Sequence, residues 1–99
     1  MSQLDDKEKI TLSTIYFKIS GRVQGVFFRA STKSMADQYG IKGWVKNQPN
    51  GDVEGIATGD ATRLKLFSEW LKRGPDMAKV LKFEVIEHEF QMFEKFEIR

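Results

Sequence analysis

The chain has 99 residues, 40% of them hydrophobic, and its 16 basic and 14 acidic side chains give a formal net charge of +2 at pH 7. This length and composition predict one globular domain with a modest core and exclude a disordered chain. The absence of cysteine excludes disulfides, thiol catalysis and thiolate metal sites, and a single histidine, His88, excludes a multi-histidine metal centre.

The first part of the chain, residues 1–12, is polar and is expected to form a flexible tail, with the domain proper spanning residues 13–99. The tail lacks the apolar stretch of a signal peptide, and no apolar run in the chain reaches membrane-spanning length. Charges of both signs are interspersed without a basic block, which argues against a nucleic-acid partner. We therefore expect a cytoplasmic, monomeric protein with no membrane partner.

The next elements are a strand and a helix. Apolar and polar residues alternate over residues 14–20, which is the period of a half-buried strand. From Phe28 the apolar residues recur at helical spacing, so a helix is expected over Phe28–Tyr39. Gly40 follows at the position where a helix commonly ends.

The loop between this strand and this helix contains two glycines, Gly21 and Gly25. Glycine adopts left-handed conformations at little cost, so the loop can turn several backbone N–H groups toward one point, beside the free donors at the helix start. An anion there would be held by main chain, and Arg29 could add a two-pronged grip on phosphate. The spacing fits neither the nucleotide P-loop nor the dinucleotide motif. Loop geometry alone leaves a phosphate cradle and a plain turn equally open.

The remaining pattern completes the fold prediction. Residues 42–47 and 51–58 read as two strands joined by a tight turn, a second helix begins at Asp60 and stops at Gly74, and two further strands follow around Phe83 and near the end of the chain. This order predicts an α+β fold of the ferredoxin-like, split βαβ type (βαββαβ), with two helices on one face of an antiparallel sheet.

Asn47 ends the second predicted strand and has two interpretations. In the first interpretation, Asn47 is a turn residue whose side chain makes a local hydrogen bond. The other follows from alternation, which places Asn47 on the same sheet face as Val45, so that its carboxamide points under the helices if Val45 does. There it offers a donor and an acceptor, enough to hold a water molecule but not to deprotonate it.

Three motifs together resemble the acylphosphatase family. They are Gly-Arg-Val-Gln-Gly-Val-Phe-Phe-Arg at residues 21–29, Gly-Trp-Val-Lys-Asn at 43–47 and Gly-Asp-Val-Glu-Gly at 51–55. The resemblance covers most of the chain and is to the small single-domain type known from animals, organ-common or muscle-like. It implies a ferredoxin-like fold and hydrolysis of acyl phosphates to carboxylate and inorganic phosphate, without a metal or other cofactor.

The resemblance also implies the site residues. Arg29 corresponds to the family's phosphate-binding arginine and Asn47 to its water-orienting asparagine. Arg22 is expected to point outward and tune the local field. The phosphate-binding segment as a whole comprises Gly21, Arg22, Val23, Gln24, Gly25, Val26, Phe27, Phe28 and Arg29.

Such a site can work without a general base. The leaving group is a carboxylate, whose conjugate acid has a pKa near ~4, so its departure needs little protonation. The transition state of phosphoryl transfer is loose, so that positioning and charge stabilisation supply most of the catalysis.

Two other readings remain. An RNA-recognition module shares this element order, but the strand at residues 52–58 carries no aromatic residue that could stack on bases. A domain that retains the fold and handles carbamoyl phosphate without catalysis is the second. The chain also departs from the family at Gln48, Pro49 and Asp52, where hydroxyl residues are common near the asparagine, and these changes are expected to affect water ordering or substrate entry.

Overall fold

Seven elements make up the part of the chain that the computed structural model describes, residues 11–99. The strands are β1 (Leu12–Arg22), β2 (Lys42–Asn47), β3 (Val53–Asp60), β4 (Lys79–His88) and β5 (Phe96–Ile98), and the helices are α2 (Phe28–Tyr39) and α3 (Ala61–Arg73). The predicted tail falls almost entirely on residues 1–10, which lie outside the described residues. No helix in the described part is long and apolar enough to cross a membrane.

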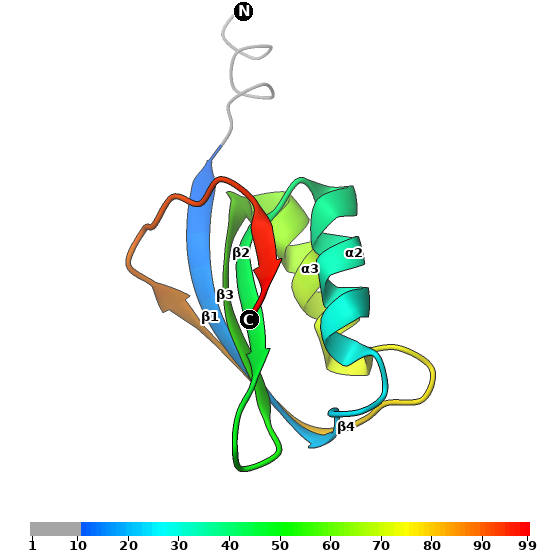
Figure 1. Cartoon of the computed structure of the whole chain (residues 1–99). Coiled ribbons are helices and arrows are strands. Elements are labelled where there is room, and N and C mark those ends of the chain that lie inside the picture. The colour runs from blue at the N-terminus through cyan, green and yellow to red at the C-terminus, as the bar shows by residue number, and fades with distance from the viewer. Residues whose placement is uncertain (1–10) are drawn as a thin grey trace, which may run out of the picture.

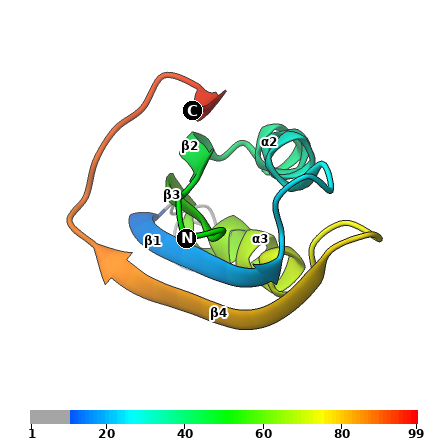
Figure 2. The same cartoon turned by 60° about the horizontal axis from the view of Figure 1, so that its bottom comes forward.

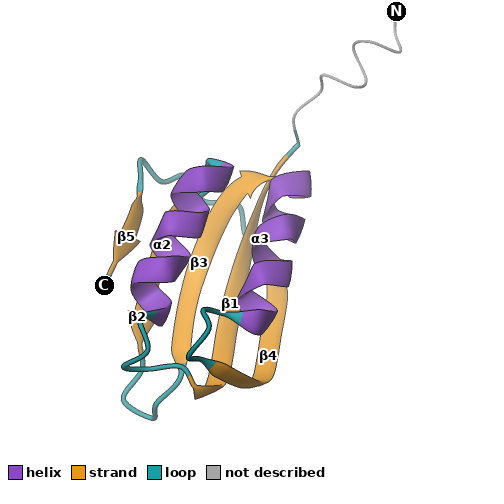
Figure 3. Ribbon diagram, turned by 90° about the vertical axis from the view of Figure 1, so that its right-hand side faces the viewer, coloured by secondary structure: helices purple, strands orange, loops and turns teal. Residues whose placement is uncertain are grey.

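The strands form one sheet in the spatial order β4-β1-β3-β2-β5, and both helices pack across the same face of it (Figures 1 and 3). The pairs β1–β4, β1–β3 and β2–β3 are antiparallel. This arrangement confirms the predicted α+β fold. The sheet is mixed rather than purely antiparallel, however, because the short strand β5 runs parallel to β2 along its outer edge.

The core lies between the sheet and the helices, as the alternation predicted. Phe17 and Ile19 of β1 and Val45 of β2 have no exposed surface, and Phe67 of α3 packs edge to face on Phe17 with ring centroids 6.0 Å apart. Phe96 of β5 contacts Phe67 in the same way at 6.1 Å, so the core holds β5 against the domain. These contacts stabilise the edge of the sheet on which the site is built.

Helix ends follow the predicted capping residues. Gly40 has φ 69° and lies at the C-terminus of α2, where Ile41 N–H donates to the Ala36 carbonyl at 2.8 Å. Asp60 precedes α3 and accepts a hydrogen bond from Arg63 N–H at 3.3 Å, as an N-cap does. The start of α2 is different. Its N-cap position is Phe27, with no side-chain cap and no acidic residue in the first turn.

Candidate active site

The loop between β1 and α2 has the backbone shape that the glycine spacing predicted. Gly25 has φ 75°, and Phe27 has φ 65°, which makes it the one non-glycine residue with positive φ between residues 11 and 99. A left-handed conformation costs a bulky residue about 1–2 kcal/mol, and such strain concentrates at functional sites. Successive turns of this kind point backbone N–H groups inward and create an anion-binding concavity.

The start of α2 adds to this concavity. Ser31 N–H makes the first helical bond, to the Phe27 carbonyl at 3.0 Å. No side chain caps the N–H groups that precede it, and no carboxylate lies in the first turn to neutralise the positive end of the helix dipole. Both features favour an anion at this position.

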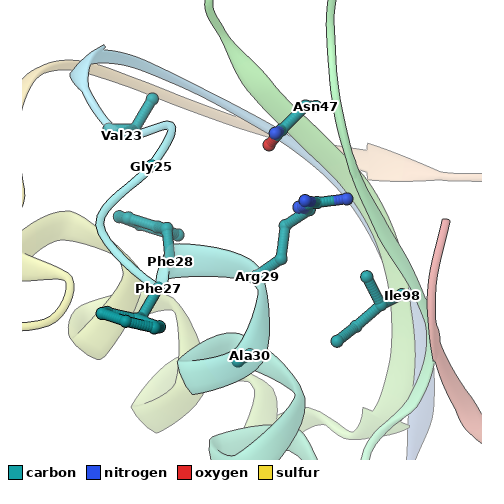
Figure 4. Close-up of a pocket in the computed structure, with 8 residues that line it drawn as sticks. All are labelled: Val23, Gly25, Phe27, Phe28, Arg29, Ala30, Asn47 and Ile98. Carbon is teal, nitrogen blue, oxygen red and sulfur yellow. The ribbon is translucent and has the colours of Figure 1, made fainter.

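Arg29 lies in the first turn of α2, and its guanidinium forms a hydrogen bond with the segment that follows β5. Its Nη1 donates to the backbone oxygen of Arg99, the residue that follows β5, at 3.2 Å. The Arg29 side chain extends from the helix toward the end of β2 (Figure 4). A guanidinium has five N–H donors, so this one contact leaves most of them for a ligand.

Asn47 is the last residue of β2 and faces the same space (Figure 4). Its Oδ1 is buried and has no hydrogen-bond partner, the one such side-chain atom among residues 11–99. Val45 on the same face is fully buried, so the alternation argument correctly placed Asn47 under the helix layer. Buried carbonyl oxygens are normally paired. An unpaired one beside an arginine therefore indicates a position for a bound molecule.

These features meet in one cavity of about 310 Å³. It is lined by Val23, Gly25, Phe27, Phe28, Arg29, Ala30, Asn47 and Ile98 (Figure 4). The cavity thus joins Arg29 and Asn47, the two predicted catalytic residues, which lie in different elements. Arg29 is the one lining residue with an ionisable side chain, so no carboxylate or imidazole side chain lines the cavity.

Four residues of the predicted phosphate-binding segment do not line the cavity. Gly21 and Arg22 belong to β1 and pair with Val80 and Lys79 of β4, beside a β-bulge. Val26 is buried in the core. Two lining residues, Ala30 and Ile98, were missed by the sequence analysis. Ile98 comes from β5, and its approach to α2 depends on a parallel strand pair that local periodicity does not reveal.

Gln24 connects the loop to the β2–β3 hairpin. Its Nε2 donates two hydrogen bonds, to the Gln48 carbonyl at 2.8 Å and to the Asp52 carbonyl at 2.9 Å. Gln48 directly follows Asn47, the last residue of β2, and Asp52 directly precedes Val53, the first residue of β3. The side chain therefore fixes the distance between the loop that would hold an anion and the strand end that carries Asn47.

We expect Gln24→Glu to lower kcat/KM about tenfold, because a carboxylate has no N–H to donate and faces two carbonyl oxygens. The loss of two part-buried hydrogen bonds should also lower stability by about 1–3 kcal/mol. The matched control is Gln38→Glu, the same change at an exposed position of α2. Thermal unfolding and steady-state kinetics on both variants check this. Wild-type kinetics in a destabilised Gln24→Glu protein would show that the contact is structural only.

Tyr16 is the described residue with a strongly shifted pKa, and it lies outside the cavity. Burial and the hydrogen bond that its hydroxyl donates to Glu54 at 2.7 Å raise the pKa of Tyr16 to about 12. The phenol consequently stays neutral at physiological pH. No group of three or more metal-ligating side chains occurs within residues 11–99.

Comparison with known proteins connects this geometry to a family. The family model described as Acylphosphatase matches residues 15–98. An acylphosphatase of Nitrosococcus oceani is 49% identical over 79 residues, which covers 77% of this chain and 89% of that protein. One of Acaryochloris marina is 46% identical over 80 residues, covering 81% of this chain and 86% of the relative.

Solved structures give the same result. The acylphosphatase structure from Coxiella burnetii superposes with a TM-score of 0.86 at 38% identity, covering 89% of this chain and 93% of that one. The Bacillus subtilis acylphosphatase gives 0.85 at 36% identity, with coverage of 90% and 99%. These relatives are bacterial, whereas the sequence motifs had suggested the animal type.

Proposed function

Because the chain belongs to the acylphosphatase family and hydrolyses acyl phosphates, we propose that the cavity between the β1–α2 loop and the end of β2 is its active site. Membership of an enzyme family sets aside the RNA-recognition and non-catalytic readings. The cavity is lined by residues of the β1–α2 loop, the first turn of α2, the end of β2 and β5. The absence of cysteine is in keeping with a cytoplasmic location.

The observation that carries the proposal is the unpaired Asn47 Oδ1 in the same cavity as the Arg29 guanidinium. A buried acceptor without a partner costs about 1–3 kcal/mol. A water molecule removes this cost when one of its hydrogens binds Oδ1, and its oxygen lone pair is then free to face a phosphorus atom. Asn47 accordingly orients the nucleophile without acting as a base.

The phosphoryl group is held from the other sides. The N–H groups of the β1–α2 loop and of the first turn of α2 bind its equatorial oxygens, and Arg29 adds two parallel donors with a positive charge. The left-handed conformations of Gly25 and Phe27 and the contact of Arg29 with the backbone oxygen of Arg99 support such an arrangement. Preorganised donors of this kind stabilise the charge of the transition state.

The water then attacks phosphorus in line with the bond from phosphorus to the leaving acyl oxygen. The water oxygen forms a bond to phosphorus while the bond from phosphorus to the acyl oxygen breaks, and the electron pair leaves with the carboxylate. A water proton passes to a phosphoryl oxygen, so the products are a carboxylate and dihydrogen phosphate. Since the carboxylate departs without prior protonation, no acid is required at the leaving oxygen.

In-line geometry also sets the direction of the acyl group. The leaving oxygen must lie opposite the water, on the side of the phosphoryl group away from Asn47. In Figure 4, Phe27 and Ala30 lie at that end of the cavity, with Arg29 between them and Asn47. Phe27 is 77% exposed. The acyl group therefore leaves over an open, apolar rim, which supports a broad range of acyl substituents.

Inorganic phosphate is expected to inhibit hydrolysis of benzoyl phosphate competitively and to raise the unfolding temperature, because it occupies the same amide and guanidinium donors. Both measurements should be made at constant ionic strength and with a chelator present, since the proposed mechanism uses no metal. A full loss of activity on chelation would contradict that part of the mechanism. Phosphate that neither competes nor stabilises would mean that the loop is only a turn.

A further inference from the structure

Phe27 is a residue of the active-site cavity whose side chain does little for the fold. Its ring is 77% exposed and therefore contributes little to the core. Its φ of 65° lies in the left-handed region, which disfavours a side chain of this size. It is also the N-cap residue of α2, a position at which its side chain makes no hydrogen bond. The ring thus lowers the stability of the loop and is at the same time available to a ligand in the cavity.

The ring belongs to an apolar surface at the rim of the cavity. Ala30 and Ile98 also line the cavity, and both are exposed, Ile98 by 44%. Val23 and Phe28 complete the apolar lining, but both are buried in the core. The apolar surface that a bound molecule can still cover therefore comes from Phe27, Ala30 and Ile98, and the Phe27 ring is the most exposed part of it.

The polar side chains of the cavity are used by the other parts of the substrate. Arg29 is the one charged side chain among the lining residues and Asn47 the one carboxamide. In the proposed reaction they bind the phosphoryl group and the water. A charged or hydroxylated acyl group consequently has no polar side chain to bind at the rim. A flat apolar acyl group can pack on Phe27, because aromatic rings attract each other in offset or edge-to-face contact beyond the effect of the area they bury.

We propose that Phe27 is a specificity-determining residue that packs on the acyl group, so that an aromatic acyl group is preferred to a small or polar one. This inference rests on the proposed active site and concerns the part of the substrate that the phosphate donors do not contact. In-line geometry directs the acyl group away from Asn47, toward Phe27 and Ala30 (Figure 4). Because the rim is open, the preference is a graded difference in kcat/KM and excludes no acyl group.

The test compares kcat/KM for benzoyl phosphate with kcat/KM for acetyl phosphate, as a ratio within each variant. Phe27→Asn should lower this ratio about three- to tenfold, which corresponds to the loss of one aromatic contact. Phe27→Trp should keep the ratio, because it retains a flat apolar ring. A displaced loop lowers kcat/KM for both substrates by the same factor and leaves the ratio unchanged. That result for Phe27→Asn would overturn the proposal.

Phe90→Asn is the matched control. Phe90 is also an exposed phenylalanine, by 52%, and it lies in the connection between β4 and β5, residues 89–95. This connection runs on the opposite side of the molecule from the β1–α2 loop (Figure 2). Its replacement should leave the ratio at the wild-type value. An equal fall of the ratio in Phe90→Asn and Phe27→Asn would show that the effect does not come from contact with the acyl group, and would contradict the proposal.

Two further measurements do not depend on turnover. Phenacylphosphonate and acetonylphosphonate carry a methylene in place of the scissile oxygen, and the wild type should bind the phenacyl compound more tightly. Phe27→Asn should narrow the difference between the two dissociation constants, and an undiminished difference would overturn the proposal.

Phe27→Asn should also unfold at or above the wild-type temperature, because asparagine tolerates a positive φ better than phenylalanine does and the exposed ring is lost. An unfolding temperature several degrees lower would mean that the ring serves the fold, which would contradict the proposal. Failure of the active site itself gives a different result. In that case Arg29→Ala hydrolyses both substrates at the wild-type rate, and the proposal for Phe27 falls with it.

Discussion

Replacement of Arg29 by alanine is expected to lower kcat/KM for an acyl phosphate by about 10²–10³-fold, with the fold intact. The side chain is half-buried at the start of α2, lines the cavity rather than the core, and contacts the backbone oxygen of Arg99 at 3.2 Å. Its removal therefore takes away charge stabilisation without opening a hole in the hydrophobic packing. Arg29→Lys should lose most of the activity too, because an ammonium cannot donate two parallel hydrogen bonds.

Arg63 provides the control for this change. It is an arginine of the other helix, and its Nη1 also donates to a backbone carbonyl, that of Tyr39 at 3.4 Å. Arg63→Ala removes a comparable contact away from the cavity and should leave kcat/KM near the wild-type value. Hydrolysis at the wild-type rate by a folded Arg29→Ala protein would reject the role of Arg29.

Replacement of Asn47 by alanine should cut kcat by about 10²–10³-fold while the phosphate inhibition constant stays near that of the wild type. The carboxamide orients the water and makes no contact that phosphate binding requires. Asn47→Asp should also be poor, because a carboxylate in its place repels the phosphoryl oxygens. Stability should change little, since Oδ1 has no partner to lose.

Asn50 is the matched control for Asn47. It lies in the same hairpin and makes the local turn contacts that the alternative interpretation assigned to Asn47, with its Oδ1 accepting from Asp52 N–H at 3.0 Å. Asn50→Ala should lower stability modestly and keep turnover. If Asn47→Ala behaves as Asn50→Ala does, Asn47 is a turn residue.

Much of this site could be predicted because its parts follow from local rules. The strand-to-helix change at residues 21–29 and the glycines within it predict a bent loop, and alternation along β2 predicts the direction of Asn47. Phe27 is the exception. Positive φ is rare for a bulky side chain, so neither that conformation nor the exposure of the ring follows from the residue type.

The features of the site and fold that the sequence did not predict depend on contacts between distant segments of the chain. Ile98 reaches the cavity only because β5 pairs with β2 in parallel. The apolar alternation around Phe83 correctly predicted a strand, but the pattern does not reveal that β4 is an edge strand with Leu81 exposed. The side chain of Gln24, a residue of the predicted phosphate-binding segment, donates to two carbonyls of the hairpin, a contact that the sequence pattern does not reveal.

The Gln24 contacts also explain why the hairpin can differ from the family pattern. Gln24 binds the backbone carbonyls of Gln48 and Asp52, and these are present whatever side chains the two positions carry. The hairpin therefore keeps its attachment to the loop despite the changed residues.

The central claim is that phosphate binding and water positioning belong to different residues, and one comparison tests it most directly. The inhibition constant of inorganic phosphate and kcat for benzoyl phosphate should be measured side by side for Asn47→Ala and Arg29→Ala. We predict that both variants lose turnover but that only Arg29→Ala loses affinity for phosphate. Wild-type turnover in Asn47→Ala, or an equal loss of phosphate affinity in the two variants, would contradict the claim.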